Sequence, residues 1–450
     1  MPNSEKRVLI VSYLFPPTGG VGVLRVTKFT KYLPEFGWQP SVLTVANPSV
    51  PLFDESLTKD IPPQTIIRQA RTFEPGYGLK GAVSAGKGAG SVKGLAKTLV
   101  GSAVRRVGSL LLQPDPQILW KPCAVRAGLQ LLREVPHDVI LVSGPPFSGF
   151  LVGAALARKT RLPLILDYRD EWGISNAHWE NKQQGRFSNW IQERMQRKVL
   201  RAANLLLATT PSSAQSLAEA AARAGSSARS AHIYNGFDRA DFPHGEPVGA
   251  RTDYGNGTRC FRLLFLGTLW NLTSIEATVA GIERLAVDNP ELISHLEIVI
   301  AGRRTGPQDA LLDRLATLPC KLVRLGFVEH TTAVRMMREA DSLLMTIADL
   351  PGAERVISYK VYEYLAAERP MFAVAPDGDL TDILRGSPGT VLCRPNETAG
   401  IAREMGTLLE RHRAGTVTVA DAGPDWDVSR FERRTQTGQL AELLNQVAAK

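Results

Sequence analysis

The stretch ERVISYKVYEYLAAERPMFAV, residues 354–374, carries the clearest fold signal in the chain. It opens with a polar loop, and Val361, Leu365 and Ala366 then recur at near-helical spacing. The Glu-Arg-Pro triplet ends this helix, and the apolar residues 371–374 that follow it are typical of a buried strand. The stretch therefore predicts one loop–helix–strand unit of an alternating α/β fold.

The start of this helix has the residue types that bind a nucleotide diphosphate. Ser358 is placed to cap the first free backbone N–H groups with its side-chain oxygen. Lys360 and Glu363 are three residues apart and share a face. A helix start attracts anions, a lysine strengthens that attraction, and a carboxylate one turn later can accept hydrogen bonds from a ribose diol. An ordinary surface Lys–Glu pair on an amphipathic helix fits the spacing equally well.

The segment SYKVYEYLAAERPMFAV resembles the donor-binding motif S-x-K-x-x-E-Y-L-A-x-x-x-P of retaining GT-B glycosyltransferases of family 4. The resemblance implies that Glu363, as the second acid of an E-x7-E pair, contacts the ribose of the donor. Arg355 stands eight residues before Glu363, where the first acid is expected, and the nearest acid is Glu354. The role of the first acid, contact with the donor sugar, therefore falls to Glu354 with a shift of one residue or is absent.

The second half of the chain alternates predicted strands and helices, which indicates a doubly wound parallel sheet. Strands are expected within residues 261–267, 296–302, 321–328 and 342–346. Three of them end at loops that are candidates for donor binding: Gly267 and Thr268, then Gly302, Arg303 and Arg304, and finally Gly326, Phe327 and Val328. The resemblance implies that the first loop holds the pyrophosphate and the third contacts the base. Plain strand-ending turns are the alternative.

Sugar transfer from a nucleotide diphosphate sugar leaves a negatively charged diphosphate, and positively charged side chains are expected to stabilise it. The Arg and Lys that often follow the first loop in the resembling family are replaced here by Leu-Trp-Asn-Leu, residues 269–272. Arg303, Arg355 and Lys360 are the remaining candidates. Asp377-Gly-Asp379 imitates the D-x-D metal motif of another glycosyltransferase fold, but it lies in a glycine-containing turn after a strand. We therefore predict neither a catalytic metal nor a cofactor.

The first half begins with a strand, the turn PPTGGVG at residues 16–22, a helix and a second strand. This is not a dinucleotide fingerprint, because Arg25 replaces the third glycine and no acid ends the second strand. A nicotinamide-dependent oxidoreductase is therefore disfavoured. The resemblance implies that Gly19 and Gly20 lie in the cleft near the donor phosphates and the acceptor. A tight turn that uses glycine's backbone freedom is the alternative.

A third group of candidates follows the predicted strand at residues 163–167, whose carboxyl end leads into YRDEW. Active-site groups collect at such strand ends. This stretch resembles the D-x-R-D-x-W segment of the same family. The resemblance implies that Arg169, Asp170 and Trp172 line the acceptor side of the cleft, and Asp170 is also a candidate catalytic residue. Alternatively, Asp170 caps the next helix and Arg169 pairs with a nearby acid.

Further matches to the family lie at residues 113–132, a P-D-P-x-x-x-W stretch, and at 233–238, an I-x-N-G-x-D hinge. Because the matches span nearly the whole chain, we predict an α/β protein of the GT-B fold, with two Rossmann-like doubly wound domains facing a central cleft. The predicted domains are an acceptor domain at 1–238, with a basic insertion at 76–112, and a donor domain at 239–425. A final helix, 426–450, is expected to cross back to the first domain.

Composition and charge narrow the classes of partner and the cellular compartment that the sequence favours. The chain has 450 residues, 44% of them hydrophobic, and a formal net charge of +9, which favours acidic or phosphorylated partners. No apolar run is long enough to span a bilayer, the short apolar run near the N-terminus lacks a cleavage site, and the four cysteines have no metal-binding spacing. These features favour a cytoplasmic protein.

Two basic regions suggest contact with an anionic membrane. Residues 76–112 contain six basic side chains and no acid, in a glycine-diluted amphipathic pattern. Arg194, Arg197, Lys198 and Arg201 share one face of a predicted helix. A flexible soluble insertion and a solvated helix face are the alternatives. Nucleic acid is not expected as a partner, because residues 76–112 have aromatic residues only at their leading edge and no aromatic platform interleaved with the charge.

The sequence therefore predicts a retaining, metal-independent glycosyltransferase that uses a nucleotide diphosphate sugar. Its acceptor would be a lipid-linked glycan at the cytosolic face of the membrane, in the synthesis of cell-surface polysaccharide. A catalytically idle GT-B partner subunit and a GT-B sugar-nucleotide epimerase or hydrolase remain open as alternatives.

Overall fold

The computed structural model describes residues 5–50, 52–74, 112–173, 186–242, 252–253, 260–416 and 426–449. The chain divides into two compact units. The first comprises Met1–Asn235 and Arg433–Lys450, and the second comprises Gly236–Glu432. In the sequence prediction the corresponding changes of unit stand at residues 238 and 426. The predicted basic insertion, 76–112, lies outside the described residues except for its last position.

The first unit is built on a seven-stranded sheet in which neighbouring strands are parallel, with the order β3-β2-β1-β4-β5-β6-β7. The strands are β1 (Lys6–Val11), β2 (Trp38–Val45), β3 (Ile66–Ala70), β4 (Val139–Gly144), β5 (Leu164–Tyr168), β6 (Leu205–Ala208) and β7 (Arg229–His232). The helices are α1 (Val21–Tyr32), α4 (Lys121–Glu134), α5 (Ser148–Thr160), α7 (Arg186–Ala202), α8 (Pro211–Ala224) and α16 (Arg433–Ala448).

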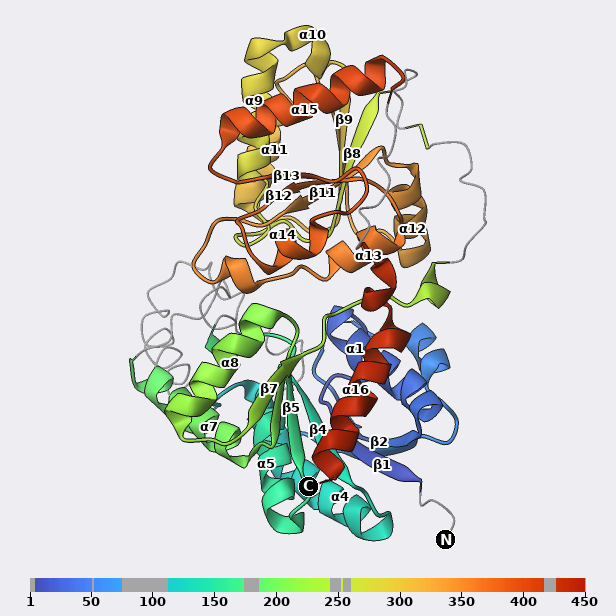
Figure 1. Ribbon diagram of the computed structural model, residues 1–450, viewed down its shortest axis with the longest axis vertical. Coiled ribbons are helices and arrows are strands. Elements are labelled where there is room, and N and C mark those ends of the chain that lie inside the picture. The colour runs from blue at the N-terminus through green and yellow to red at the C-terminus, as the bar shows by residue number, and fades with distance from the viewer. Residues whose placement is uncertain are drawn as a thin grey trace, which may run out of the picture. The chain divides into compact units, whose positions relative to one another are not determined.

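Helices cover both faces of this sheet, because successive side chains of a strand point to opposite sides. Val8 and Ile10 of β1 face a core that includes residues of α1 and α16. Leu9 and Val11 face the other core, which α4, α5, α7 and α8 complete (Figure 1). The last helix thus packs on the first unit, although it comes from the opposite end of the sequence.

A buried ion pair fixes α1 against the sheet. Arg25, on α1, donates two hydrogen bonds of 3.0 and 3.1 Å to one carboxylate oxygen of Asp167, on β5, and both side chains are almost fully buried. Arg25 also donates to the carbonyl oxygens of Ile233 and Tyr234, at 3.0 and 2.9 Å. The arginine that interrupts the glycine pattern therefore joins three distant parts of the first unit.

The second unit repeats the architecture with six parallel strands in the order β10-β9-β8-β11-β12-β13. The strands are β8 (Phe261–Leu266), β9 (Leu296–Ala301), β10 (Lys321–Leu325), β11 (Ser342–Thr346), β12 (Met371–Val374) and β13 (Val391–Cys393). The helices are α9 (Glu276–Asp288), α10 (Pro290–Ile293), α11 (Gly306–Leu315), α12 (His330–Glu339), α13 (Lys360–Ala366), α14 (Asp379–Leu384) and α15 (Thr398–Arg413).

Short 3-10 turns connect several of these elements. They are η1 (Leu33–Phe36), η2 (Glu55–Asp60), η3 (Pro116–Trp120), η4 (Arg239–Asp241), η5 (Ala353–Arg355) and η6 (Val428–Phe431). The prediction of two Rossmann-like parallel-sheet domains is confirmed. The loop–helix–strand prediction for residues 354–374 is also confirmed, as η5, α13 and β12. Among the described residues, the helices are too short or too polar to cross a membrane.

Candidate functional site

Both sheets have a point where the strand order reverses direction, and ligands of open α/β sheets bind outside the strand carboxyl ends at such points. In the second unit this point lies between β8 and β11. The strand β8 runs into Gly267, and β11 leads through η5 to α13. In the first unit the point lies between β1, which leads to Gly19 and Gly20, and β4, which ends at Gly144. Most of the predicted site residues lie at one of these two edges.

Three glycine loops meet at the edge of the second sheet. The φ angles of Gly267 and Gly302 are +135° and +125°, and residues other than glycine rarely adopt such values. A Cβ atom on Gly302 would lie only 2.0 Å from the carbonyl oxygen of Gly267. The amide of Gly302 in turn donates to the carbonyl of Gly326, at 2.9 Å. Glycine is therefore required here for close approach of the backbones, and the three predicted donor loops form one surface.

Lys360 extends across this surface from the first turn of α13. A Cβ atom on Gly267 would lie 2.3 Å from Cε of Lys360 and 3.5 Å from its Nζ. The ammonium group is 3.9 Å from a carboxylate oxygen of Glu363, and both side chains remain partly exposed. The structure thus brings together Gly267, Gly302, Gly326, Lys360 and Glu363, as the sequence predicted.

Two side chains support these loops: Tyr364, which was not predicted as a site residue, and Arg304, which was predicted to lie in the second loop. The backbone amide of Leu266 donates to the hydroxyl of Tyr364 at 2.9 Å, and burial raises the pKa of Tyr364. Arg304 donates to the carbonyls of Gly302 and Leu325, at 3.1 and 2.7 Å, and so ties β9 to β10. Tyr364 was not predicted because nothing in the helical pattern distinguishes it from the other residues of α13.

The loop before α13 differs from the prediction in one respect. No side-chain hydrogen bond caps α13, and Ser358 instead accepts from the amide of Val361 through its backbone carbonyl, at 3.1 Å. The predicted Ser358 cap is therefore wrong, because the chain enters α13 through Tyr359 in helical conformation. Glu354 accepts a hydrogen bond from Arg355 at 2.9 Å, so these two catalytic candidates pair with each other.

Several candidates around the loops keep their side chains exposed. Thr268 and Arg303 are exposed, Val328 is partly buried, and Phe327 exposes 84% of its surface at the end of β10. An exposed aromatic ring and an exposed guanidinium beside a glycine loop are able to contact a base and a phosphate. Asp377, of the D-x-D imitation, accepts two hydrogen bonds from Arg394, which lower the pKa of its carboxyl.

In the first unit, Gly19, Gly20 and Arg169 lie at the corresponding edge. The amide of Gly19 donates to the carbonyl of Leu52 at 3.0 Å, and Gly20, with φ +96°, directly precedes α1. A Cβ atom on Gly22 would lie 3.1 Å from Nη1 of Arg169. The guanidinium of Arg169 therefore lies beside the first turn of α1, where unpaired backbone N–H groups favour anions.

Arg169 is buried without full pairing. It donates to the carbonyl of Pro145 through Nη2, but its Nε and Nη1 atoms are buried and have no partner among the described residues. Burial lowers the pKa of its guanidinium, and the nearby carboxylates of Asp170 and Asp167 oppose that shift. Unpaired buried donors are uncommon in folded proteins, which makes Arg169 a candidate for contact with a ligand or an ordered water. Among the described residues the guanidinium of Arg169 forms no hydrogen bond to a carboxylate, so the alternative in which Arg169 pairs with a nearby acid is not supported.

Asp170 and Trp172, its two neighbours in the motif, differ in exposure. The side chain of Asp170 reaches the surface, yet the dense protein around it raises the pKa of its carboxyl, with Arg169 opposing. Trp172 is 2% exposed, stacks on Phe147 with centroids 4.7 Å apart, and donates to Gln192 at 2.9 Å. Trp172 therefore supports the loop from within the core and is not open to an acceptor.

The raised pKa of Asp170 gives a pH-dependent prediction for stability. An acid with a raised pKa in the folded state opposes folding as pH rises through that pKa, because ionisation is then easier in the unfolded chain. We expect Asp170→Asn to be as stable as the wild type at pH 3 and more stable at pH 7. Urea unfolding across this range measures the difference, and an advantage that shrinks as pH rises would contradict the shift.

Comparison with known proteins gives the class of enzyme. Residues 19–228 match the model of a glycosyl transferase 4-like domain, and residues 260–411 match that of glycosyl transferases group 1. Between them the two models match most of the chain, one in each unit. The chain is a GT-B glycosyltransferase. A search of curated proteins gave no match.

Solved structures agree with this fold. This glycosyltransferase resembles HepE of Anabaena, solved with UDP and glucose, at 16% identity and a TM-score of 0.60, covering 98% of this chain and 100% of that one. It resembles the sucrose-phosphate synthase of Thermosynechococcus elongatus at 13% identity and a TM-score of 0.61, with 99% of both chains covered. It also resembles the trehalose-phosphate synthase of Burkholderia xenovorans, solved with glucose-6-phosphate, at 12% identity and a TM-score of 0.55. That match covers 98% of this chain and 97% of the other.

Proposed function

We propose that this glycosyltransferase takes its sugar from a nucleotide diphosphate sugar that binds at the carboxyl edge of the second sheet. The observation that carries the proposal is the position of Lys360, whose side chain crosses Gly267 while its ammonium group stays near Glu363. In this arrangement Lys360 and Arg303 neutralise the diphosphate, Glu363 accepts from the ribose, and Phe327 contacts the base. HepE was solved with UDP, and we therefore favour a uridine nucleotide.

The proposed reaction replaces the bond between the anomeric carbon and the phosphate with a glycosidic bond. Negative charge develops on the departing diphosphate, and preorganised donors in a site that excludes water stabilise it strongly. The proposal includes retention of the anomeric configuration and independence of a metal ion. Proton NMR of the product defines the configuration, and activity in excess EDTA tests the second point.

The acceptor is proposed to be a lipid-linked glycan of cell-surface polysaccharide, with the enzyme cytoplasmic and peripheral on the membrane. Arg169, Asp170, Gly19 and Gly20 are the acceptor-side residues in this proposal. The unpaired buried donors of Arg169 support an acceptor that carries negative charge, such as a phosphorylated lipid. Comparing nucleotide release with and without a lipid-linked acceptor separates transfer from donor hydrolysis.

The donor site is tested by thermal shift with UDP, GDP, ADP, their sugars and NAD. A nucleotide at about 100 times its dissociation constant stabilises a protein by about 2.7 kcal/mol. We expect one nucleotide family to raise the melting temperature of the wild type and to fail with Glu363→Ala. Glu410→Ala, at an exposed position of α15, is the matched control and retains the shift. No shift with any nucleotide would refute the donor site and favour an idle partner subunit.

A further inference from the structure

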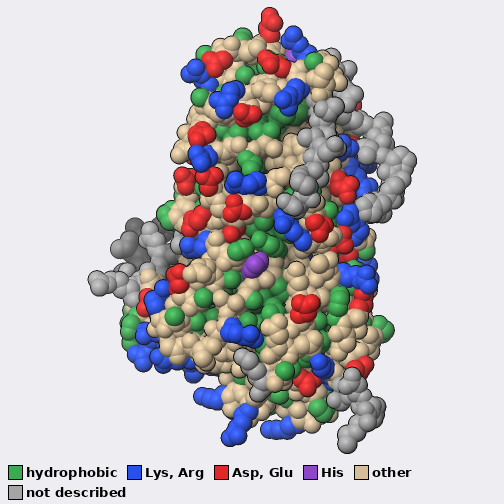
Figure 2. All heavy atoms as spheres, in the orientation of Figure 1, with side chains coloured by type: hydrophobic (Ala, Val, Ile, Leu, Met, Phe, Trp, Pro, Cys, Tyr) green, Lys and Arg blue, Asp and Glu red, His purple; other side chains and the backbone are tan. Residues whose placement is uncertain are grey.

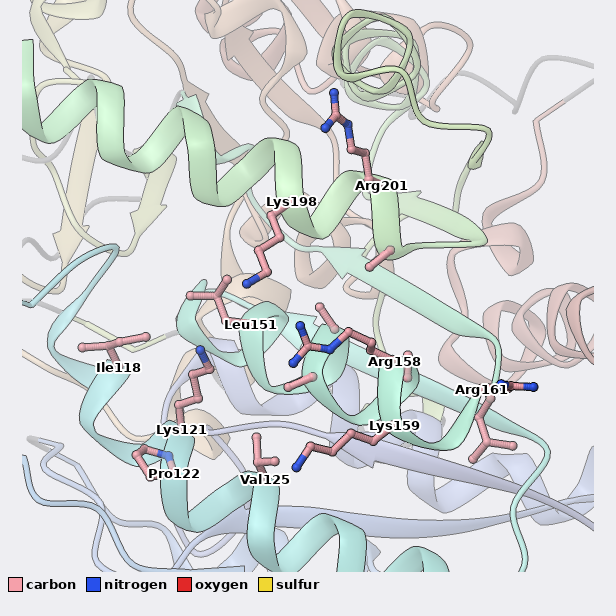
Figure 3. A pocket seen from close by; sticks show the side chains of 15 residues that line it. Ile118, Lys121, Pro122, Val125, Leu151, Arg158, Lys159, Arg161, Lys198 and Arg201 are labelled. Carbon is pink, nitrogen blue, oxygen red and sulfur yellow. The ribbon is translucent and has the colours of Figure 1, made fainter.

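A second, strongly basic hollow lies on the first unit, away from the sheet edges described above. It has a volume of about 830 Å³ and lies among α4, α5 and α7 (Figure 3). Six of its lining residues are cationic: Lys121, Arg158, Lys159, Arg161, Lys198 and Arg201. The remaining described lining residues are apolar: Ile118, Pro122, Val125, Leu151, Ala154, Ala155, Ala157, Leu162 and Ala202. We call this feature the basic groove.

The charge of the basic groove is uncompensated. Its described lining contains no acid, and none of the six cations forms an ion pair with a described carboxylate. Figure 3 shows the nitrogen atoms of Lys121, Arg158 and Lys198 on different sides of Leu151, directed toward the space between α4, α5 and α7. Burial, followed by the charges of Lys198 and Arg158, lowers the pKa of Lys121. An anion bound in the basic groove would relieve this repulsion.

An exposed aromatic pair continues the basic groove along α7. Phe187 and Trp190 expose 58% and 48% of their surfaces and stack with centroids 5.8 Å apart. Arg194 lies over the Trp190 ring at 4.8 Å. The spacing from these aromatics to Arg194, Lys198 and Arg201 places all of them on one helix face. Figure 2 shows Lys and Arg side chains gathered along the lower rim of this unit, where α5 and α7 lie in Figure 1.

We propose that the basic groove and the exposed face of α7 form the surface by which this enzyme docks on an anionic phospholipid membrane. Lysines and arginines bind the phosphates, while Phe187 and Trp190 enter the boundary between headgroups and acyl chains. Charge spread over three helices fits a surface of many phosphates better than one small anion. The groove lining itself has no aromatic side chain, and the faces of Phe187 and Trp190 that meet each other and Arg194 are already occupied, which favours a membrane over stacking with successive bases. The inference deepens the proposed function, because it places the enzyme where its lipid-linked acceptor lies.

The test is co-sedimentation of the full chain with phosphatidylcholine vesicles, with or without about one-third phosphatidylglycerol. We expect binding only to the anionic vesicles. A Lys or Arg near such a surface contributes about fivefold, so Lys121→Glu, Arg158→Glu and Lys198→Glu together weaken partitioning by at least about a hundredfold. Phe187→Ser with Trp190→Ser keeps the net charge and is expected to weaken partitioning by about tenfold.

The control makes the same change in net charge at exposed arginines of the second unit: Arg385→Glu, Arg411→Glu and Arg413→Glu. The docking surface is overturned if this control loses as much binding as the groove variant, or if the wild type ignores anionic vesicles. It is also overturned if only changes at Lys80, Lys87 and Lys93 abolish binding, or if a single-stranded oligonucleotide displaces the vesicles. Thermal shift with UDP on the same variants distinguishes this failure from failure of the donor site.

Discussion

Replacing Lys360 with methionine is expected to lower kcat/KM for sugar transfer by about a hundredfold to a thousandfold, the usual effect of removing one preorganised donor from developing negative charge. Methionine keeps an unbranched stem that fills the space over Gly267, where Cε of Lys360 lies 2.3 Å from a hypothetical Cβ. The substitution therefore removes the charge and retains the packing. The loss is expected mainly in kcat, because the charge on the diphosphate increases during the reaction.

Two matched variants locate the effect. Arg303→Met removes the other exposed cation of the donor loops, and Arg413→Met removes an exposed cation at the end of α15. Nucleotide release in the presence of acceptor is measured for all three proteins. A large loss in Arg303→Met with a nearly normal Lys360→Met would assign the main cation to the loop after β9 instead. An equal loss in Arg413→Met would show that net charge alone is responsible.

The second large effect concerns folding of the first unit. Asp167→Asn is expected to reduce the free energy of unfolding by about 3–5 kcal/mol, because it leaves the charge of Arg25 buried without its counterion. The side-chain exposures of the two residues are 1% and 0%, so water cannot replace the lost partner. Urea unfolding, followed by fluorescence and circular dichroism, measures the change.

The buried position causes this effect, and an exposed pair provides the comparison. Asp288→Asn breaks the surface pair with Arg284, at 2.8 Å, and is expected to change stability by less than about 1 kcal/mol. Arg25→Met combined with Asp167→Leu removes both charges and is expected to recover much of the loss. If the double variant is as unstable as Asp167→Asn, the hydrogen bonds of Arg25 to Ile233 and Tyr234 carry the stability instead.

The sequence predicted most reliably what depends on local pattern. Helical spacing of Val361, Leu365 and Ala366 and the following proline placed α13 and β12, and alternation of such units predicted the two parallel sheets. The glycines at strand ends were found because parallel strands send their carboxyl ends to one edge. Lys360 and Glu363 were predicted because they match a family motif, and the structure places Lys360 against the loop at Gly267, with Glu363 beside it.

What the sequence left open depends on contacts between distant residues. The pair Arg25–Asp167 spans 142 positions, and nothing local distinguishes its arginine from a surface residue. Burial of Trp172 depends on Phe147 and Gln192, which other elements supply. The basic groove is the same kind of case: Lys198 and Arg201 were noticed on their helix, but Lys121 and Arg158 join them only after folding. A sequence pattern describes one helix or strand at a time, whereas the ion pair, the buried tryptophan and the basic groove depend on how several elements pack together.

Arg169 has a consequence for engineering this enzyme. Two of its buried nitrogens have no partner among the described residues, so we expect an apolar residue of similar size at that position to make the first unit more stable. Variants selected only for resistance to heat would therefore tend to discard Arg169 early, and with it any affinity for an anionic acceptor. Position 169 is therefore best left unchanged in a library selected for stability, because the residue that stabilises the fold there differs from the residue expected to bind the acceptor.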